Sequence, residues 1–369
     1  MARRSRREAA IAPAPRRPRS GCRKYFQSLG IILFFLILLS AGGAFFFFRA
    51  LTDPYKGFAQ PAVQVEVRKG ERTAAILRHL RDAGVLRDEF VPLVYLKVVR
   101  HGDSLKAGIY EFSKPLSAAD VLEKIIRADV VERTVVVREG LDRFAVALLM
   151  ASERFGKVAE WNKLTADAER IRDIDPQATS LEGYLFPDTY KLTPGTPPRV
   201  IVQTMTDNFR KHFGGELAFI STGLDLHDTV TLASIVETEA KLPQERPIVA
   251  SVYLNRHRKG MLLGADPTVI YALKLARRWT GNIHHDDLAI DSPYNTYRVR
   301  GFPPGPIASP GMASLRAASN PAQTNFLYFV ARNDGSHAFA TNLAEHNHNV
   351  QVYQKLYWQN QRAAAPPVK

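Results

Sequence analysis

Cysteine is almost absent from this chain, since Cys22 is the one cysteine among 369 residues. A single thiol cannot close an internal disulfide, which excludes a small disulfide-stapled domain. Glycine and proline number 23 each and follow no period, which excludes a collagen-like repeat. A GxSxG elbow, an SxxK motif and a phosphate-binding glycine loop are also missing, so serine acyl transfer and nucleotide chemistry have no support.

Acidic residues are scarce at the N-terminus, where residues 1–24 carry nine lysines and arginines against Glu8 alone. This segment supplies +8 of the net charge of +14 and leaves +6 for the other 345 residues. The rest of the chain is therefore only mildly basic, and it shows no recognisable nucleic-acid-binding module. No nucleic-acid partner is predicted.

A long hydrophobic run occurs once, in the 20 uncharged residues from Leu29 to Phe48. As a helix this run measures about 30 Å, the hydrocarbon thickness of a bilayer. The basic flank predicts a cytoplasmic N-terminus, with the remainder of the chain outside the cytoplasm. A signal peptide cleaved near Gly42 is the alternative. The apolar run continues through Phe45–Phe48, which favours an uncleaved single-pass anchor.

The sequence after the anchor predicts an α+β fold in two parts. In the first part, strands are expected at 65–67 and 108–112, a helix at 73–80, and another helix capped by Ser117. The second part begins with a strand at 135–137 and a helix at 144–150. The predicted domains are a basic cytoplasmic tail (1–28), a transmembrane helix (29–48), a tether (49–62), a small α+β module (63–130), a larger mixed α+β domain (131–358) and a disordered tail (359–369).

Two glutamates stand near the end of a predicted helix that Asp228 would cap and that would run to about Ala240. Glu237 and Glu239 point about 200° apart on a helix, so they cannot share one site. Glu237 follows a face of small residues, which leaves room for a ligand, and Glu239 follows a bulkier face. Either carboxyl could be a general acid that burial keeps protonated, or both could reach solvent. Periodicity does not choose between them.

Polar and aromatic residues further along the chain suit a carbohydrate, because rings stack on sugars and amides bind hydroxyl groups. The same residues are also common in turns and cores, and this alternative stays open. The segment 294–310 is too rich in proline and glycine to form one regular element, and such segments are often functional loops. His284–Asp287 and His346 with His348 lack the spacing of a helical metal motif, so no metal and no cofactor is predicted.

Several motifs together resemble one family, the bacterial endolytic murein transglycosylases. They lie in order at 182–189 (EGYLFPDT), 233–240 (ASIVETEA), 249–256 (VASVYLNR), 260–261 (GM), 266–271 (DPTVIY), 294–297 (YNTY), 301–307 (GFPPGPI), 341–343 (TNL) and 346–347 (HN). The resemblance covers nearly the whole chain. Because many ordered motifs match at once, the signal is far more specific than any one of them.

This resemblance implies a membrane-anchored enzyme with a LysM-like module at 63–130 and a catalytic region at 131–358. Family members cleave the β-1,4 bond between N-acetylmuramic acid and N-acetylglucosamine in nascent glycan strands and leave 1,6-anhydro ends. By motif position Glu237 is the catalytic carboxylate, acting first as general acid and then as base. The residues implied to line the sugar cleft are Asp266, Thr268, Tyr294, Asn295, Tyr297 and Asn342.

The same resemblance implies a bacterial inner-membrane location, peptidoglycan strands as substrate and cell-wall synthases as partners. Two other functions remain open. One is a non-catalytic peptidoglycan-binding anchor. The other is a hydrolytic muramidase that uses Asp266 or Asp188 as a second carboxylate. Whether Glu239 contributes is also open.

Overall fold

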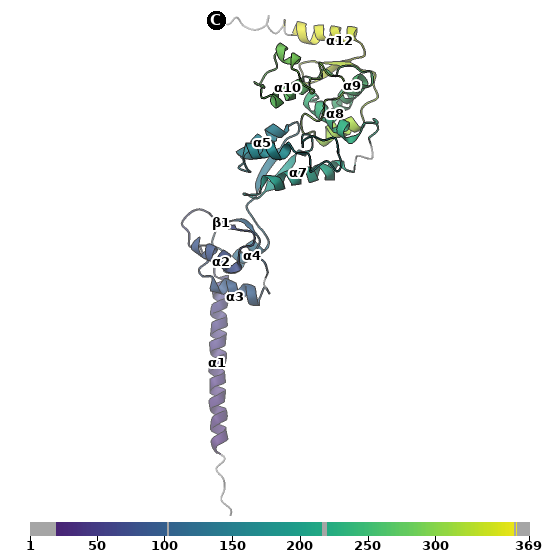
Figure 1. The fold of residues 1–369 in the computed structure, drawn as a ribbon. Helices are drawn as coiled ribbons and strands as arrows, with labels where there is room; N and C mark the ends of the chain where they lie inside the picture. Colours follow the sequence, from purple (N-terminus) through teal and green to yellow (C-terminus); the bar gives the residue numbers. More distant parts are fainter. Residues whose placement is uncertain (1–19, 102, 216–219, 358, 360–369) are drawn as a thin grey trace, which may run out of the picture. The chain divides into compact units, whose positions relative to one another are not determined.

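The computed structural model describes residues 20–101, 103–215, 220–357 and 359, which form two compact units that divide after Val131. The fold is mixed α+β, as predicted (Figure 1). Most of the predicted basic tail (1–19) and of the predicted disordered tail (360–369) lies outside the described residues.

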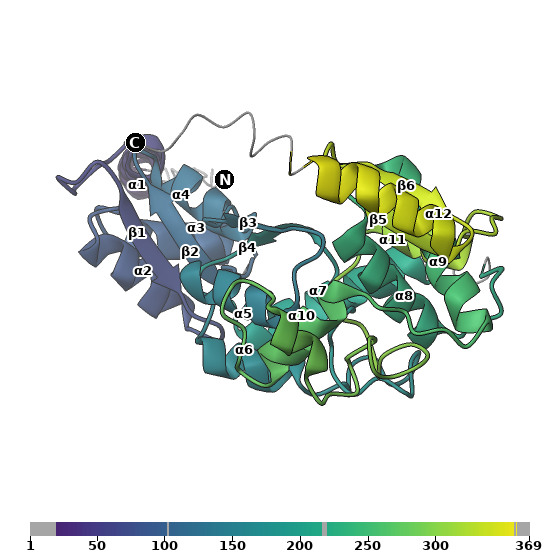
Figure 2. The same cartoon turned by 90° about the horizontal axis from the view of Figure 1, so that it is seen from above.

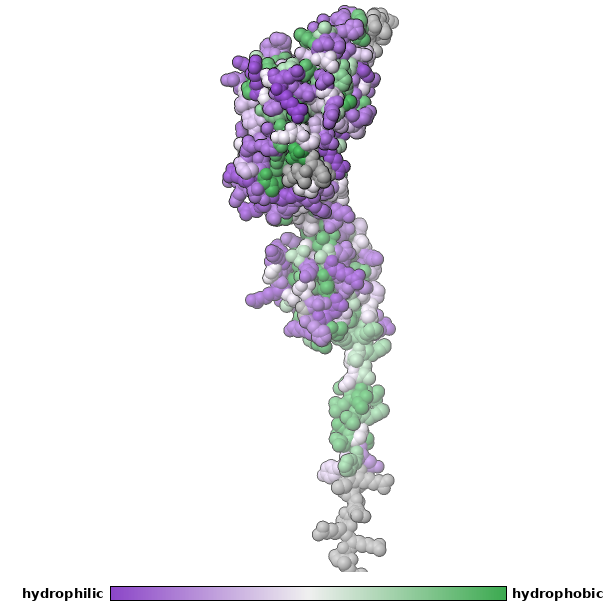
Figure 3. All heavy atoms as spheres, turned by 90° about the vertical axis from the view of Figure 1, so that its right-hand side faces the viewer, coloured by the Kyte–Doolittle hydropathy of each residue, from purple (hydrophilic) through white to green (hydrophobic). Residues whose placement is uncertain are grey.

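The first unit begins with the helix α1 (Ser20–Thr52), which contains the predicted membrane span. Its 33 residues correspond to about 50 Å. Among the described residues, the stretch Tyr25–Thr52 is long and apolar enough to cross a membrane. Exposed apolar side chains dominate the face of this helix that Figure 3 shows.

A small two-layer module follows α1 within the first unit. Its elements are β1 (Val63–Val67), α2 (Thr73–Asp82), α3 (Phe90–Val98), β2 (Gly108–Phe112) and α4 (Ala118–Ile126). The strands pair antiparallel, with Val63 opposite Phe112 and Val67 opposite Gly108. The predicted cap is confirmed, because Ser117 Oγ accepts a hydrogen bond from the N–H of Asp120 at 3.1 Å. The core of the module is formed by Leu77, Leu80, Tyr110, Phe112, Leu122 and Ile125.

The predicted tether at 49–62 packs against this module and does not run free. Leu51 in the last turn of α1 is buried. The N–H of Tyr55 donates to the carbonyl of Leu116 at 2.9 Å, and the N–H of Gly57 donates to the carbonyl of Gly84 at 2.8 Å. The module therefore sits directly at the end of α1, because apolar burial and backbone hydrogen bonds fix the connecting segment.

The second unit contains the remaining helices and strands. Its first part consists of β3 (Arg133–Val137), α5 (Arg143–Ser152), α6 (Val158–Thr165), β4 (Asp188–Leu192) and α7 (Pro198–Phe213). Its second part consists of α8 (Leu226–Glu239), η2 (Pro243–Glu245), α9 (Arg246–Arg258), α10 (Asp266–Leu275), η3 (His285–Ala289), α11 (Met312–Ser319), β5 (Tyr328–Ala331), β6 (His337–Ala340), α12 (Leu343–Val350) and η4 (Gln351–Leu356). Strands β3 and β4 pair antiparallel, as do β5 and β6, and α12 lies over the β5–β6 hairpin (Figure 2).

Helix α8 forms the centre of the second unit, and every residue from Thr229 to Val236 is buried. It begins one turn earlier than the sequence suggested. Asp225 is the N-cap, since its Oδ1 accepts from the N–H of Asp228 at 2.8 Å. The prediction that Asp228 caps the helix is therefore wrong. Two aspartates three residues apart are both good caps, and only the folded chain chooses between them.

Candidate active site

A proline- and glycine-rich segment, residues 303–311, runs along one face of α8 and is attached to it at three levels. Near the start of the helix, His227 Nε2 lies 3.1 Å from the carbonyl oxygen of Pro304. In the middle, the N–H of Ile307 donates to Ser234 Oγ at 3.0 Å. These contacts share a face because residues seven apart on a helix point nearly the same way.

The third contact is at the last turn of α8, where the N–H of Gly311 donates to Glu237 Oε2 at 2.9 Å. The small-residue face below Glu237 is thus filled by protein. Ala233 and Ser234 are fully buried, and the side chain of Pro306 fits against Gly183, where a Cβ would stand 2.5 Å from it. The expectation that this face leaves room for a ligand is wrong, because small side chains here admit a backbone segment.

Glu237 is held by a cation as well as by this backbone donor. Arg246, the first residue of α9, places its Nη2 3.1 Å from Glu237 Oε1. Both side chains are nearly buried, with 6% of Glu237 and 11% of Arg246 exposed. Charge-assisted hydrogen bonds of this kind fix the orientation of a carboxyl group. The sequence reasoning missed Arg246, since nothing in its spacing separates it from a surface arginine.

A second carboxyl group lies beside Glu237 and was also missed. Glu139 lies in the turn after β3, and its Oε1 stands 1.8 Å from the position that a Cβ on Gly311 would take. The turn is tied to the same segment, since the N–H of Gly140 donates to the carbonyl of Ser309 at 2.9 Å. Burial raises the pKa of Glu139, the charge of Glu237 raises it further, and Arg246 acts in the opposite direction.

Glu239 lies in a different environment, as the angle between the two side chains on the helix predicted. The hydroxyl of Tyr253 donates to Glu239 Oε1 at 3.1 Å. Burial raises the pKa of Glu239 to about 7; the Tyr253 hydrogen bond lowers it and the charge of Asp266 raises it. Asp266 in turn accepts a hydrogen bond from the hydroxyl of Tyr297 at 2.6 Å.

The residues proposed from sequence to line a sugar cleft divide into two groups. Asp266 and Tyr297 are exposed and hydrogen-bonded to each other. Tyr294 is half-buried, with its ring centroid 5.0 Å from that of Tyr271. The structure thus brings Asp266 and Tyr297 together at the surface, on the side of Glu239.

The other three residues hold parts of the protein together. Thr268 is fully buried and its Oγ1 lies 2.8 Å from that of Thr296. Asn295 is also fully buried, and its Nδ2 donates to the carbonyls of Leu288 and Ile290. Asn342 is exposed and caps α12. The side chains of Thr268 and Asn295 have no exposed surface with which to contact a ligand in this structure.

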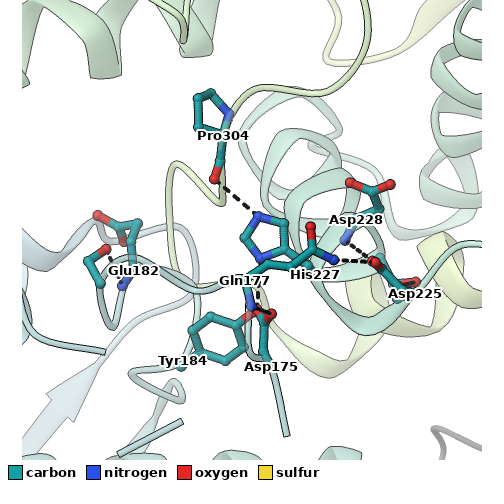
Figure 4. A network of polar contacts seen from close by, with 10 residues as sticks. Asp175, Gln177, Glu182, Tyr184, Asp225, His227, Asp228 and Pro304 are labelled. Carbon is teal, nitrogen blue, oxygen red and sulfur yellow. Dashed lines mark hydrogen bonds and ion pairs between the residues drawn. The ribbon is translucent and has the colours of Figure 1, made fainter. Parts of the chain in front are cut away.

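A buried polar network anchors the other end of α8 (Figure 4). His227 Nδ1 lies 2.8 Å from Asp175 Oδ2, and the hydroxyl of Tyr184 donates to the same carboxylate. The hydrogen bond to Asp175 raises the pKa of His227, with burial acting against it. Because both ring nitrogens face acceptors, the imidazolium form satisfies every contact. This network fixes the start of the segment that reaches Glu237.

Glu182 is a further buried carboxyl in the motif 182–189. The N–H of Arg143 donates to both of its oxygens, at 3.1 and 3.0 Å. Burial raises the pKa of Glu182 to about 8, and the nearby charge of Asp142 adds to this. The hydrogen bonds connect the start of α5 to the turn that carries Gly183, so Glu182 stabilises the scaffold below the Glu237 site.

A cavity of about 620 Å³ lies where the start of α9 meets α11, lined by Pro243, Pro247, Ala313, Arg316, Ala317, Ser319 and Asn320. Pro247 follows Arg246 directly, and Ala313 lies two residues beyond Gly311. Glu237 itself does not line this cavity. Across the described parts of the chain, no three or more His, Cys, Asp or Glu side chains are grouped so as to hold a metal ion.

Comparison with known proteins decides the family. The model of the YceG-like family matches residues 65–352, which is most of the chain. The protein belongs to the YceG-like family. It is 31% identical over 324 residues to a protein of Bacillus subtilis (strain 168) named endolytic murein transglycosylase, with 83% of this chain and 88% of the relative covered.

Two further similarities support membership of the YceG-like family. A protein of Streptococcus pneumoniae (D39), also named endolytic murein transglycosylase, is 30% identical over 329 residues, which are 80% of this chain and 59% of that protein. The 2.6 Å crystal structure of a yceG-like protein from Listeria monocytogenes has a TM-score of 0.53 and 30% identity, and the alignment covers 79% of this chain and 99% of that one.

Proposed function

We propose that this protein is an endolytic murein transglycosylase that cuts peptidoglycan glycan strands, with Glu237 as its one acid–base residue. The observation that carries the proposal is the position of Glu237 in this family member. It ends a buried helix and lies between the guanidinium of Arg246 and the backbone N–H of Gly311. These two donors orient a carboxyl group, as a proton-transferring residue requires.

The reaction that we propose balances with a single carboxyl group. Protonated Glu237 gives its proton to the glycosidic oxygen, and the bond from that oxygen to C1 of N-acetylmuramic acid breaks. The C6 hydroxyl of the same sugar attacks C1 and loses its proton to the Glu237 carboxylate. The products are a 1,6-anhydro end and a free N-acetylglucosamine hydroxyl. No water is consumed, so the second carboxylate of ordinary glycoside hydrolysis is not required.

The neighbours of Glu237 support both halves of this cycle. Arg246 and the N–H of Gly311 stabilise the carboxylate after the first proton transfer, because both donate hydrogen bonds to it. The Glu237 side chain is only 6% exposed, which shields its carboxyl group from bulk water. Asp266, Tyr294, Tyr297 and Asn342 are the proposed sugar contacts that have exposed or half-buried side chains. Thr268 and Asn295 act by holding the elements that carry them.

The first unit supports a proposal for where the protein acts. We infer that α1 spans the bacterial inner membrane with its basic end in the cytoplasm, because positive flanks are retained there. The β1–α2–α3–β2 order of the module, with its two antiparallel strands, supports a LysM-like role in glycan binding. A cutter anchored in this way reaches newly made strands near the membrane, and a cell-wall synthase is its proposed partner.

The deciding experiment is digestion of polymerised glycan strands by the full-length protein, with mass spectrometry of the new ends. We expect muramyl ends lighter than reducing ends by one water. Glu237→Gln abolishes cleavage, and the matched change Glu239→Gln, two residues along the same helix, leaves it. Reducing ends alone assign a hydrolytic muramidase. Unchanged strand lengths with the wild-type protein assign a peptidoglycan-binding anchor.

A further inference from the structure

The turn after β3 brings a second carboxyl group to Glu237. Gly311 donates its N–H to Glu237 Oε2, and the place of its missing side chain is occupied by Glu139. On the other side, the position of a Cβ on Gly140 lies 3.8 Å from Glu237 Cγ. The two carboxyl groups therefore flank one glycine. Glu139 is on the exposed side and Glu237 on the buried side.

Two carboxyl groups this close resist carrying two negative charges at once. The charged groups that act on Glu139 are Glu237, which opposes its ionisation, and Arg246, which favours it. Arg246 forms its ion pair with Glu237. Glu139, Glu237 and Arg246 together carry one positive charge when both carboxyl groups are protonated. Loss of both protons leaves the three side chains with a net negative charge. Burial and the charge of Glu237 therefore both raise the pKa of Glu139.

We propose that Glu139 is a positioning residue for the proposed transglycosylase reaction, and that its carboxyl group, packed against Gly311 beside Glu237, makes glycan cleavage less sensitive to rising pH. This inference rests on the function proposed above. Arg246 and the N–H of Gly311 are the hydrogen-bond donors to Glu237. Glu139 brings a second carboxyl group to the same place, where two negative charges repel each other.

The test is the pH profile of glycan cleavage by the full-length protein. Glu139→Gln keeps the shape of the side chain and removes its charge. We expect the alkaline limb of kcat/KM to move to lower pH by about one unit, which lowers activity there about tenfold. Activity at acidic pH changes little, and Glu139→Asp restores part of the shift. Glu132→Gln, directly before β3, is the matched control with an unchanged profile.

Each outcome separates the two proposals. A wild-type protein that leaves glycan uncut overturns the proposed function. A wild-type protein that cuts glycan, with a Glu139→Gln profile that superimposes on it or falls equally at every pH, overturns only the role of Glu139. Thermal unfolding of each variant shows that the compared proteins are folded.

A separate observation concerns α3, which is apolar on both of its sides. Pro92 and Leu96 are buried in the module. The opposite side presents Phe90, Val94, Lys97 and Val98 at helical spacing, and Phe90 and Val98 are 69% and 66% exposed. A helix that is apolar all round is normally covered by protein or by lipid.

The position of α3 indicates whether protein or lipid covers its exposed side. Helix α3 packs against the end of α1, and Ala50 and Pro92 line the same small cavity. Ala50 lies two residues beyond the last uncharged residue of the span, which is about 3 Å along the helix. The polar headgroup layer on each side of a bilayer is thicker than this. The apolar surface of α1 continues onto the adjoining part of the module (Figure 3).

We propose that the outer face of α3 (Phe90, Val94, Lys97 and Val98) lies in the headgroup layer of the membrane that α1 spans. Apolar side chains are buried at the acyl boundary by such interfacial helices, and a lysine on that face extends its ammonium to anionic headgroups. The occupant of this surface is the lipid itself. The module then contacts the membrane in addition to α1, and this second contact fixes the tilt of the module on the bilayer.

Site-specific fluorescence in vesicles of phosphatidylethanolamine and phosphatidylglycerol tests this. Cys22→Ser removes the native thiol from the full chain, and an environment-sensitive dye is attached through Phe90→Cys. We expect quenching by lipids spin-labelled near the headgroup. The matched control position is Lys69→Cys, which lies beyond the last residue of β1. This end of β1 is the one farther from the Tyr55–Leu116 contact, so quenching there should be weak.

Leu38→Cys inside α1 is the positive control for insertion. If the dye at position 90 is as unquenched as the dye at position 69 while that at position 38 is quenched, the proposal is wrong. Energy transfer between dyes at position 90 on different copies, without lipid quenching, assigns the face to a second copy of the chain and also overturns it.

Discussion

Arg246 Nη2 lies 3.1 Å from Glu237 Oε1, and both side chains are nearly buried. A nearly buried charge pair is held in place because neither partner can lose the other without leaving a charge away from water. The pair joins the last turn of α8 to the first residue of α9. The geometry of the proposed catalytic carboxyl group therefore depends on the short connection between two helices.

This dependence predicts the effect of Arg246→Ala. The change leaves Glu237 buried without its cation, so we expect the free energy of unfolding to fall by about 3 kcal/mol and glycan cleavage to be lost. Urea unfolding measures the first effect and glycan digestion the second. In a Glu237→Gln background the same change should cost clearly less, since no charge is left behind. An equal cost in both backgrounds would contradict a stabilising role for the ion pair.

The His227–Asp175 pair predicts a dependence of stability on pH. The hydrogen bond to Asp175 raises the pKa of His227 in the folded protein above its ordinary value of 6.5. The pair therefore contributes its full stability below pH 6.5, and the contribution is lost as the pH rises through the raised pKa. Urea unfolding of His227→Gln should show a larger deficit at pH 6 than at pH 9. His285→Gln, at a 97% exposed side chain, is the control.

The local sequence pattern predicted the helices and strands well. It did not predict contacts between residues that are far apart in the chain. The strand at 108–112, the Ser117 cap and the divergent directions of Glu237 and Glu239 all follow from rules that act within one or two turns. The Asp225 cap was missed by one turn. The approach of Glu139 to Glu237 was not predictable, because the two residues are 98 positions apart in the chain.

The small-residue face of α8 shows the same limit in another form. Periodicity showed that this face is small and buried, and it cannot show what covers it. The segment 303–311 does so, and its irregular conformation was itself correctly expected from its proline and glycine content. Thr268 and Asn295 were expected to face a sugar, and residue type alone could not separate that role from the hydrogen bonds they make inside the protein.

Removing the carboxyl group of Glu239 is expected to stabilise the protein and to leave cleavage intact, whereas Glu237→Gln abolishes cleavage. The pKa of Glu239 is raised from 4.5 to about 7, chiefly by burial, so its ionised form costs stability at higher pH. Glu239→Gln removes this cost. We expect the variant to gain stability over the wild type as the pH rises from about 4.5 to about 7, with a constant gain above that. Glycan cleavage should be retained. A loss of cleavage as severe as that of Glu237→Gln would assign Glu239 a direct part in the reaction.

Gly311→Ala separates the position of Glu139 from the stability of the fold. Gly311 has φ of −78°, a conformation open to any residue, so an alanine there causes no backbone strain. Its Cβ would overlap Glu139 Oε1, and the exposed end of that side chain can move away at little cost. We expect a melting temperature close to that of the wild type together with a several-fold fall in cleavage at alkaline pH, as for Glu139→Gln. Gly215→Ala, where a Cβ meets nothing within 4 Å, should change neither quantity. Normal cleavage by Gly311→Ala at every pH would show that the contact between Glu139 and this glycine has no part in the reaction.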